Sequence, residues 1–263
     1  MSDSIIHKSL FAGFLQFDVK SGNIDSNLAR VEEGLAEIAT SSKQISPGII
    51  VLPELWATGF AYEKLPELTK RIPNLLEKLQ ALSAKYGVHI AGSLPEYSEN
   101  SYYNTLFITD PKGIAGTYRK QRLFNPMEED TFFTPGIKPR PVQTALGPIG
   151  ALVCYDLRFP ELLRTQTALG TELLVVPAQW PAARLDQWRI LVQARAIENQ
   201  MFVIAANRCG TTRDTLFGGH SMIVAPNGSI LQEAGEDEEC KGIMLDLELA
   251  SAAKSLFNTV PKN

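Results

Sequence analysis

The chain has 263 residues, of which 44% are hydrophobic and 21% charged, and its formal net charge is −4. This composition excludes an intrinsically disordered chain, and the acidic balance argues against a general nucleic-acid-binding protein, which needs a basic face. No apolar run approaches the roughly 18 residues that a membrane-spanning helix requires.

The first residues and the cysteine content indicate a cytoplasmic protein. The segment Met1–Lys8 lacks a basic stretch followed by a long apolar core, so we expect no signal peptide. The three cysteines, Cys154, Cys209 and Cys240, form no Cys-x-x-Cys pair, and an odd number is a poor disulfide framework. A reducing compartment is expected, in which each cysteine serves either packing or chemistry.

Strands and helices alternate over the first third of the chain. Continuous apolar runs are typical of strands buried on both faces, and apolar residues three and four positions apart are typical of helices. Asp25 or Ser26 is expected to cap the first helix, and Gly87 to end the second. The expected elements are strands at Leu10–Phe17, Ile49–Leu52 and Val88–Ser93, and helices around Leu28–Ile38 and Leu75–Tyr86.

The remainder of the chain adds hairpins to this alternation. Asp110–Gly113 and Gly147–Pro148 separate apolar runs and predict hairpins, and Asn227–Gly228 marks another tight turn. The expected strands are Tyr103–Thr109, Ile114–Arg119, Val142–Leu146, Ile149–Cys154, Leu173–Val176, Phe202–Ala206, Ser221–Ala225 and Ile243–Leu247. The expected helices are Leu162–Leu169, with Pro160 in its first turn, and one from about Asp186 with an apolar stripe of Ile190, Ala194, Ile197 and Met201.

No linker, repeat or low-complexity tract divides the chain, so residues 1–263 are expected to form one domain. Strand–helix units favour parallel strand pairs and hairpins favour antiparallel ones, which indicates an α/β fold with mixed pairing. The acidic run Glu236–Glu239 lies between strands and is expected to be a solvated loop.

Three residues with catalytic potential follow predicted strands. Cys154 precedes a helix whose amides can stabilise a thiolate or an oxyanion, although a buried packing cysteine is the simpler interpretation. Glu54 lies at the carboxyl end of a buried strand, where burial would raise its pKa toward that of a general base, and a surface acid is the alternative. Lys120 follows a third strand among three cations, where a solvated turn is the alternative.

Three blocks of sequence surround these residues: Val51–Leu55, Tyr118–Lys120 and Leu152–Glu161. In this order the blocks resemble the nitrilase superfamily of carbon–nitrogen hydrolases. The resemblance extends over essentially the whole chain. Further matching segments are Phe14–Gln16, Tyr103–Thr105, Pro177–Trp180, Ala194–Gln200, Asn207–Arg208 and Gly219–Ser221.

The resemblance implies a fold, an assembly and a set of catalytic roles. The fold is a four-layer α-β-β-α sandwich with two mixed sheets, and the assembly is a homodimer or higher homo-oligomer formed through helices that flank the sheets. Cys154 is implied as the nucleophile and Glu54 as the general base. Lys120 and the backbone amide of Tyr155 are implied to stabilise the oxyanion.

Many members of the superfamily have a further glutamate between the lysine and the cysteine. Glu129 fits it best, because it precedes Thr134–Gly136 at the family's spacing, and the adjacent Glu128 stays open. The implied reaction needs no metal and no cofactor. Metal-ligand spacing is absent around the three histidines, His7, His89 and His220.

The segment that follows the cysteine distinguishes branches of the superfamily. True nitrilases usually place Trp-Glu there, whereas Tyr155–Phe159 resembles the amidase branches. Ala178–Trp188 together with Ala194–Gln200 resembles the omega-amidases, which hydrolyse dicarboxylic acid monoamides such as 2-oxoglutaramate. The resemblance therefore implies an amidase that converts a small carboxamide to a carboxylate and ammonia through a thioester.

A substrate of this class carries a remote carboxylate that needs a cation. Arg158, Arg184 and Arg208 are the candidates, although a structural ion pair is the simpler interpretation of any one arginine. Trp180 either walls the pocket or fills the core. Three alternatives stay open: an amidase for deaminated glutathione or another short amide, a non-catalytic partner protein of the same fold, and a hydrolase that pairs a cysteine with His220.

Overall fold

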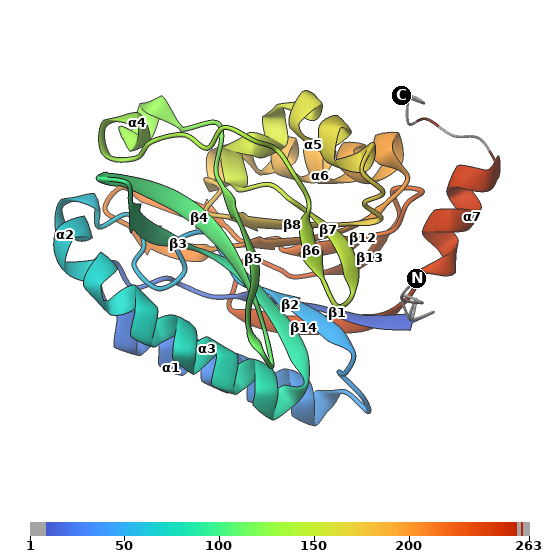
Figure 1. Cartoon of the computed structure of the whole chain (residues 1–263), viewed down its shortest axis with the longest axis horizontal. Helices are drawn as coiled ribbons and strands as arrows, with labels where there is room; N and C mark the ends of the chain where they lie inside the picture. The colour runs from blue at the N-terminus through green and yellow to red at the C-terminus, as the bar shows by residue number, and fades with distance from the viewer. Residues whose placement is uncertain (1–8, 257–258, 260–263) are drawn as a thin grey trace.

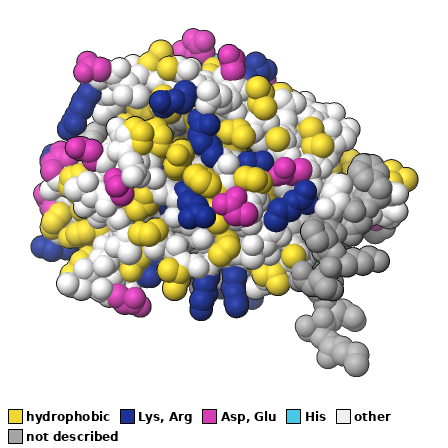
Figure 2. Space-filling view, turned by 90° about the horizontal axis from the view of Figure 1, so that it is seen from above, with side chains coloured by type: hydrophobic (Ala, Val, Ile, Leu, Met, Phe, Trp, Pro, Cys, Tyr) yellow, Lys and Arg dark blue, Asp and Glu magenta, His cyan; other side chains and the backbone are white. Residues whose placement is uncertain are grey.

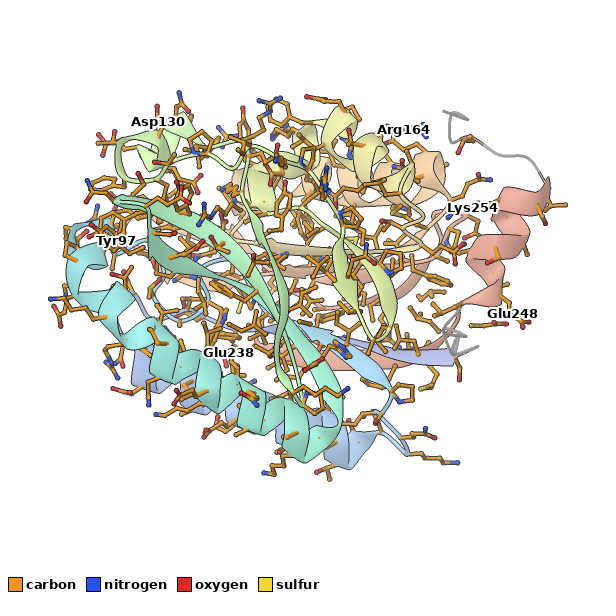
Figure 3. All side chains as sticks on the ribbon, viewed as in Figure 1. Tyr97, Asp130, Arg164, Glu238, Glu248 and Lys254 are labelled. Atoms are coloured by element: carbon orange, nitrogen blue, oxygen red, sulfur yellow. The ribbon has the colours of Figure 1, made fainter. Side chains whose placement is uncertain are left out.

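The computed structural model describes residues 9–256 and 259, which fold into four layers in the order helix, sheet, sheet, helix (Figure 1). Two six-stranded sheets face each other, and a third sheet has two strands. Side chains fill the space between the large sheets (Figure 3). The predicted fold class, an α-β-β-α sandwich with two mixed sheets, is confirmed.

Each large sheet combines strands from distant parts of the chain. The first has the order β14 (Glu239–Asp246), β1 (Ser9–Gln16), β2 (Gly48–Val51), β3 (Val88–Ser98), β4 (Ser101–Asp110) and β5 (Gly113–Arg119). The second has the order β13 (Ile230–Glu233), β12 (Met222–Val224), β9 (Phe202–Asn207), β8 (Leu173–Ala178), β7 (Gly147–Ala151) and β6 (Val142–Thr144). The third pairs β10 (Cys209–Thr212) with β11 (Thr215–Gly218).

Helices cover the outer face of each large sheet. α1 (Ile24–Ser41) and α3 (Ile72–Tyr86) cover the first, and α5 (Pro160–Thr167) and α6 (Leu185–Asn199) cover the second (Figure 1). The other helices are α2 (Leu65–Leu68), α4 (Glu129–Phe132) and α7 (Glu248–Leu256). Within the described part of the chain, no helix has the length and apolar character needed to cross a bilayer.

The central strands of the sandwich are buried on both faces, which explains their continuous apolar sequences. In β1, Phe11 and Leu15 pack in the cluster beneath α1 and α3, whereas Ala12 and Phe14 pack between the sheets. β1 pairs parallel with β2, and β2 with β3, because α1 and α3 connect them. The hairpin of β4 and β5 is antiparallel, as Asp110–Gly113 predicts.

Two details of local structure differ from the sequence expectation. The N-cap of α1 is Asn23, rather than Asp25 or Ser26, and its side chain accepts a hydrogen bond from the Ser26 amide (3.1 Å). The turn between β6 and β7 lies before Gly147–Pro148, because Gly147 already pairs with Thr144 within the hairpin. Gly87 ends α3 in the left-handed conformation, as predicted.

The predicted apolar stripe of α6 points largely to the surface. Ile190 is 65% exposed and Ile197 is 52% exposed. The buried face instead carries Trp188, Val192 and Ala196, which recur every four residues on another side of the helix. Because the exposed isoleucines also recur at helical spacing, the sequence pattern does not distinguish them from the buried face that carries Trp188.

The sequence did not predict every element of the fold, but it did predict the exposed acidic loop. The β10–β11 hairpin, β13 and α7 are short or weakly patterned segments without a clear apolar period. Within the acidic run, residues 236–238 are exposed as expected, and Glu239 begins β14.

The fold brings strand ends from both sheets to one edge of the sandwich. The backbone amide of Glu54, just after β2, donates to the Ala178 carbonyl at the end of β8 (3.4 Å). Lys120 follows β5 and Cys154 follows β7 at the same edge. Side chains separated by up to a hundred positions in sequence therefore meet there.

Candidate active site

Eight of the candidate residues that the sequence suggests line one pocket. The pocket holds about 420 Å³ of space not filled by protein atoms, its open mouth included. The predicted lining residues are Glu54, Lys120, Glu129, Cys154, Tyr155, Arg158, Trp180 and Arg184. The other lining residues are Phe60, Tyr62, Phe124, Met127, Gln179 and Pro181.

Lys120 lies at the centre of a buried charge cluster. Its ammonium donates to Glu54 Oε1 (2.7 Å) and to both carboxylate oxygens of Glu129 (2.9 and 2.7 Å). None of the three side chains is more than 2% exposed. Burial alone would lower the pKa of Lys120, but the carboxylates of Glu129 and Glu54 raise it well above its usual value. Lys120 is therefore a stable cation in the site.

Glu54 is held by groups from both sheets. The backbone turns sharply after β2, with a φ of +43° at Leu55, and Ser93 Oγ on β3 holds the turn by accepting from the Leu55 amide (2.8 Å). From the second sheet, Gln179 donates its backbone N–H to Glu54 Oε2 (3.2 Å) and its side-chain amide to the Glu54 carbonyl (2.7 Å). Burial raises the pKa of Glu54, as the sequence predicts, which suits a group that takes and returns a proton.

Glu129 accepts hydrogen bonds from three different residues. It begins α4, and besides the Lys120 ammonium it accepts the Phe124 amide at Oε2 (2.8 Å) and the Asn104 side-chain amide at Oε1 (3.0 Å). Asn104 also donates to Glu54 Oε1 (2.8 Å), so one amide bridges the two carboxylates. These donors, together with the ammonium, compensate for the burial of both acids.

Cys154 lies where the chain leaves β7 and enters the short 3₁₀ segment Cys154–Arg158. Its φ of +46° is in the left-handed region, which non-glycine residues adopt mainly where the surrounding structure enforces it. Burial raises the pKa of the Cys154 thiol well above its usual value, and the charge of Glu54 adds to this effect. The charge of Lys120 and a hydrogen bond with the Gln179 backbone act in the opposite direction and lower this pKa. The net effect is a raised pKa, which favours the protonated sulfur.

The mouth of the pocket is built from arginines and aromatic rings. Arg158 lies over the Trp180 ring (4.8 Å) and donates to the Gln187 side chain (2.6 Å), and Arg184 lies over the Phe124 ring (5.7 Å). Neither arginine forms an ion pair with any residue that the structure describes. Figure 2 views the side of α4, α5 and α6 and shows Lys and Arg side chains set among hydrophobic ones.

Tyr155 and Trp180 form fixed walls of the pocket. The Tyr155 ring packs against Phe124 (5.0 Å between centroids) and against Phe159 (5.3 Å). Trp180 is buried, and its indole N–H donates to the Arg184 carbonyl (2.9 Å). Trp180 therefore both walls the pocket and fills the core, and it holds the backbone that carries one of the two arginines.

Arg208 and His220 lie outside the pocket. Arg208 is 1% exposed and donates to Asp18 Oδ1 (2.8 Å) and to Gln179 Oε1 (2.9 Å), so it is a structural ion pair rather than a substrate contact. His220 Nδ1 lies 2.9 Å from a carboxylate oxygen of Glu233, away from Cys154. Glu128 is exposed, whereas Glu129 points inward.

The remaining histidines are His7 and His89. His89 is buried in β3, and His7 lies outside the described residues. Within residues 9–256 and 259, no group of three His, Cys, Asp or Glu side chains is arranged to hold a metal ion.

Two residues that contact Glu54 were missed as site residues. Asn104 and Gln179 stand within segments that carry the family resemblance, Tyr103–Thr105 and Pro177–Trp180, but a neutral amide gives no electrostatic signal in a sequence. Their importance comes from position alone, since Asn104 lies on β4 and Gln179 follows β8, whereas Glu54 follows β2. To find them, one would have needed to know which strand ends lie next to each other in the fold.

Comparisons with known proteins agree with this geometry. The family model described as carbon–nitrogen hydrolase matches residues 11–254. The chain is 38% identical to the 2-oxoglutaramate amidase of Bacillus subtilis (strain 168), over 95% of this chain and 96% of that protein. It is 30% identical to the omega-amidase NIT2 of Xenopus tropicalis, over 89% of this chain and 87% of that protein. A crystal structure of a carbon–nitrogen hydrolase from Helicobacter pylori G27 superposes with a TM-score of 0.88 at 25% identity, covering 95% of this chain and 94% of that one. The chain therefore belongs to the carbon–nitrogen hydrolase family of the nitrilase superfamily, as its sequence blocks predict.

Proposed function

We propose that this protein is an amidase for small carboxamides whose remote end carries a carboxylate, with 2-oxoglutaramate as the representative substrate. One observation carries the proposal: a buried cysteine, lysine and pair of glutamates share a pocket whose mouth holds two arginines without a carboxylate partner among the described residues. The relatives named 2-oxoglutaramate amidase and omega-amidase support the same substrate class.

The first half of the proposed reaction forms a thioester. Glu54 takes the proton of the Cys154 thiol as the sulfur bonds to the amide carbon, and the carbonyl electron pair moves to oxygen. Lys120 and the backbone amide of Tyr155 stabilise the resulting oxyanion. The carbonyl then re-forms, the carbon–nitrogen bond breaks, and protonated Glu54 gives its proton to the departing ammonia. Because the pKa of the thiol is raised, proton transfer and attack have to be coupled.

The second half of the proposed reaction releases the acid. Glu54 takes a proton from water as the water oxygen bonds to the thioester carbon, and a second oxyanion forms near Lys120. The carbon–sulfur bond then breaks, the carboxylic acid leaves, and the sulfur recovers its proton from Glu54. Glu129 and Asn104 hold Lys120 and Glu54 in place through both halves.

The arginines at the mouth support an anionic substrate. Arginine binds a carboxylate with two parallel hydrogen bonds, and an arginine that already has a carboxylate partner is not free to do so. Arg122 pairs with Glu161 and Arg189 with Glu233. Among the described residues, the hydrogen bond and ring contact of Arg158 are with a neutral amide and with Trp180, and no carboxylate pairs with it. A substrate carboxylate would supply the ion-pair partner that Arg158 lacks among the described residues.

Ammonia release from three compounds tests the proposal: 2-oxoglutaramate, a neutral aliphatic amide of similar length, and the corresponding nitrile. We expect the purified protein to have the highest kcat/KM on 2-oxoglutaramate. Preference for the nitrile would overturn the amidase assignment. Equal kcat/KM for the neutral amide would overturn the anionic substrate class, and the absence of turnover on every amide would favour a non-catalytic partner protein.

We also propose that residues 1–263 form a single domain and that the protein is a homodimer. The family model supports the first part, because one match spans residues 11–254. Exposed Ile190 and Ile197 on α6 support the second, since a sheet-flanking helix with exposed isoleucines suits a self-complementary contact. Light scattering at micromolar concentration is expected to show a dimer or larger species, and a monomer would contradict it.

A further inference from the structure

Asp156 is a fully buried acid beside the pocket that does not line it. Its side chain has 0% exposure, and it stands two residues after Cys154. A carboxylate buried without a charged contact needs several hydrogen-bond donors, so its partners show what its burial accomplishes.

The four donors of Asp156 come from the two segments that carry Lys120 and Cys154. Oδ1 accepts the backbone amides of Gln121 (3.2 Å) and Arg122 (2.8 Å), which follow Lys120 directly. Oδ2 accepts the Tyr118 hydroxyl (2.9 Å), from the end of β5, and the Val153 backbone amide (3.1 Å), which precedes Cys154.

These bonds connect the two sheets. Lys120 leaves β5 of the first sheet, and Cys154 leaves β7 of the second. Among the described residues, every hydrogen bond between segments 118–122 and 153–158 ends on Asp156. The backbone of Lys120 is otherwise bonded to Asn104 and Gly136, which do not belong to the cysteine segment.

We propose that Asp156 is a positioning residue that fixes the Cys154 sulfur relative to the Lys120 ammonium. This inference rests on the proposed function, in which both groups act on the same carbonyl. A displacement of about 1 Å between such groups can lower a rate by about a hundredfold. Hydrogen bonds that fix the two segments relative to each other therefore preserve the rate of the reaction.

The informative variant is Asp156→Asn, which keeps the size of the side chain. An amide offers one oxygen acceptor and one NH₂ donor, so whichever way it turns, at least one backbone N–H now faces an NH₂ group. Tyr118→Phe is a milder second variant that removes one of the four donors and keeps the carboxylate. Ser83→Ala is the control, because Ser83 is buried on α3 with a single side-chain bond to Thr109 (3.1 Å) and is remote from the pocket lining.

Two readouts are measured for each variant: kcat and KM on the amide that the wild type hydrolyses fastest, and the rate at which iodoacetamide alkylates Cys154, followed by mass spectrometry. We expect Asp156→Asn to lower kcat by about a hundredfold with KM within about twofold, and to slow alkylation several-fold. Tyr118→Phe should lower kcat several-fold with KM unchanged. Ser83→Ala should change the melting temperature but neither readout.

The proposal is overturned if folded Asp156→Asn keeps both kcat and the alkylation rate within about twofold of the wild type. If that variant does not fold, Tyr118→Phe decides: a wild-type kcat and alkylation rate overturn the proposal, and a lower kcat or slower alkylation at unchanged thermal stability supports it. If the wild type hydrolyses no amide, the proposed function fails. The alkylation rates still decide on Asp156, because alkylation requires no turnover.

Discussion

The pocket contains two sets of charged side chains that differ in burial and in pairing. At its base, Glu54, Lys120 and Glu129 are fully buried, and each charge faces an opposite charge at 2.7 Å. At its mouth, Arg158 and Arg184 are partly or fully exposed and rest on aromatic rings without an ion-pair partner among the described residues. The charges at the base are therefore balanced by the protein itself, whereas the described residues do not balance the charges of the two arginines at the mouth.

This difference separates chemistry from recognition. Removing one charge from the base leaves its partners buried and uncompensated, so activity and stability should fall together. Removing a charge from the mouth leaves nothing uncompensated in the protein, so only the binding of an anionic substrate should suffer.

The largest effect is expected from Cys154→Ala. Without the sulfur no thioester forms, and kcat should fall by roughly 10⁴- to 10⁶-fold. Cys209→Ala is the matched control, because Cys209 is also a buried free cysteine but does not line the pocket. Its kcat should stay near the wild-type value. Equal losses in the two variants would remove Cys154 from the reaction.

The next effect is expected from Lys120→Met, which keeps an unbranched side chain one atom shorter but removes the charge. Loss of the oxyanion partner should lower kcat by about 10²- to 10³-fold. Because Glu54 and Glu129 then remain buried without a cation, the free energy of unfolding should fall by about 3–5 kcal/mol in urea denaturation.

A surface lysine provides the comparison for this variant. Lys112→Met in the β4–β5 turn should leave both kcat and the free energy of unfolding unchanged, because Lys112 is exposed. If Lys120→Met were as stable as Lys112→Met, the base of the pocket would not be a compensated charge cluster.

Asp156 adds a buried acid of a different kind to this comparison. Four uncharged donors contact it, and burial raises its pKa to about 6 from its usual value of 3.8. The folded protein therefore holds this proton more tightly than the unfolded chain, so the stabilising contribution is full below pH 3.8 and is lost as pH rises through about 6.

Asp156→Asn lacks this titration. The difference in unfolding free energy, variant minus wild type, should therefore rise in favour of the variant by up to ~3 kcal/mol between acidic and neutral pH. Denaturation curves of both proteins across that range measure it. A difference that stays constant with pH would mean that burial does not raise this pKa.

The smallest effect is expected at the mouth. Arg158→Gln and Arg184→Gln should each raise KM for 2-oxoglutaramate by about tenfold, the value of one charge-assisted hydrogen bond, with little change in kcat. KM for a neutral amide and the free energy of unfolding should be unchanged. Arg213→Gln, which alters an exposed arginine outside the pocket lining, should change none of these quantities.

Unequal responses of the two mouth arginines would identify the one that holds the carboxylate. If neither variant changes KM for the anionic substrate, the proposal that the arginines at the mouth bind the substrate carboxylate is wrong.

The sequence predicted those parts of the site whose signal lies within a short segment of the chain. Glu54, Lys120 and Cys154 each lie at the end of a predicted strand. The order of the three blocks around them resembles one superfamily, so the family and its fold could be expected from the sequence alone. Glu129 was found by its spacing to the segment that follows it, and the structure brings it to 2.7 Å from Lys120.

The parts that escaped prediction depend on contacts between sheets. Gln179 contacts Glu54 across 125 positions in sequence, and Arg208 contacts Asp18 across 190. Nothing in the segments around Gln179 or Arg208 shows where the other sheet will pack, so Gln179 was overlooked, and the choice between a substrate contact and a structural ion pair stayed open for Arg208. The raised pKa of Cys154 has the same origin, because it follows from burial between two sheets rather than from the helix that comes after it.

The most direct test of the account is to quench the wild-type enzyme in acid during turnover of 2-oxoglutaramate and to analyse the peptide that contains Cys154 by mass spectrometry. The account predicts an acyl group on this cysteine, joined as a thioester, that disappears once the substrate is consumed and never forms in Cys154→Ala. Steady release of ammonia by Cys154→Ala, with no acyl group on the wild-type peptide, would contradict it.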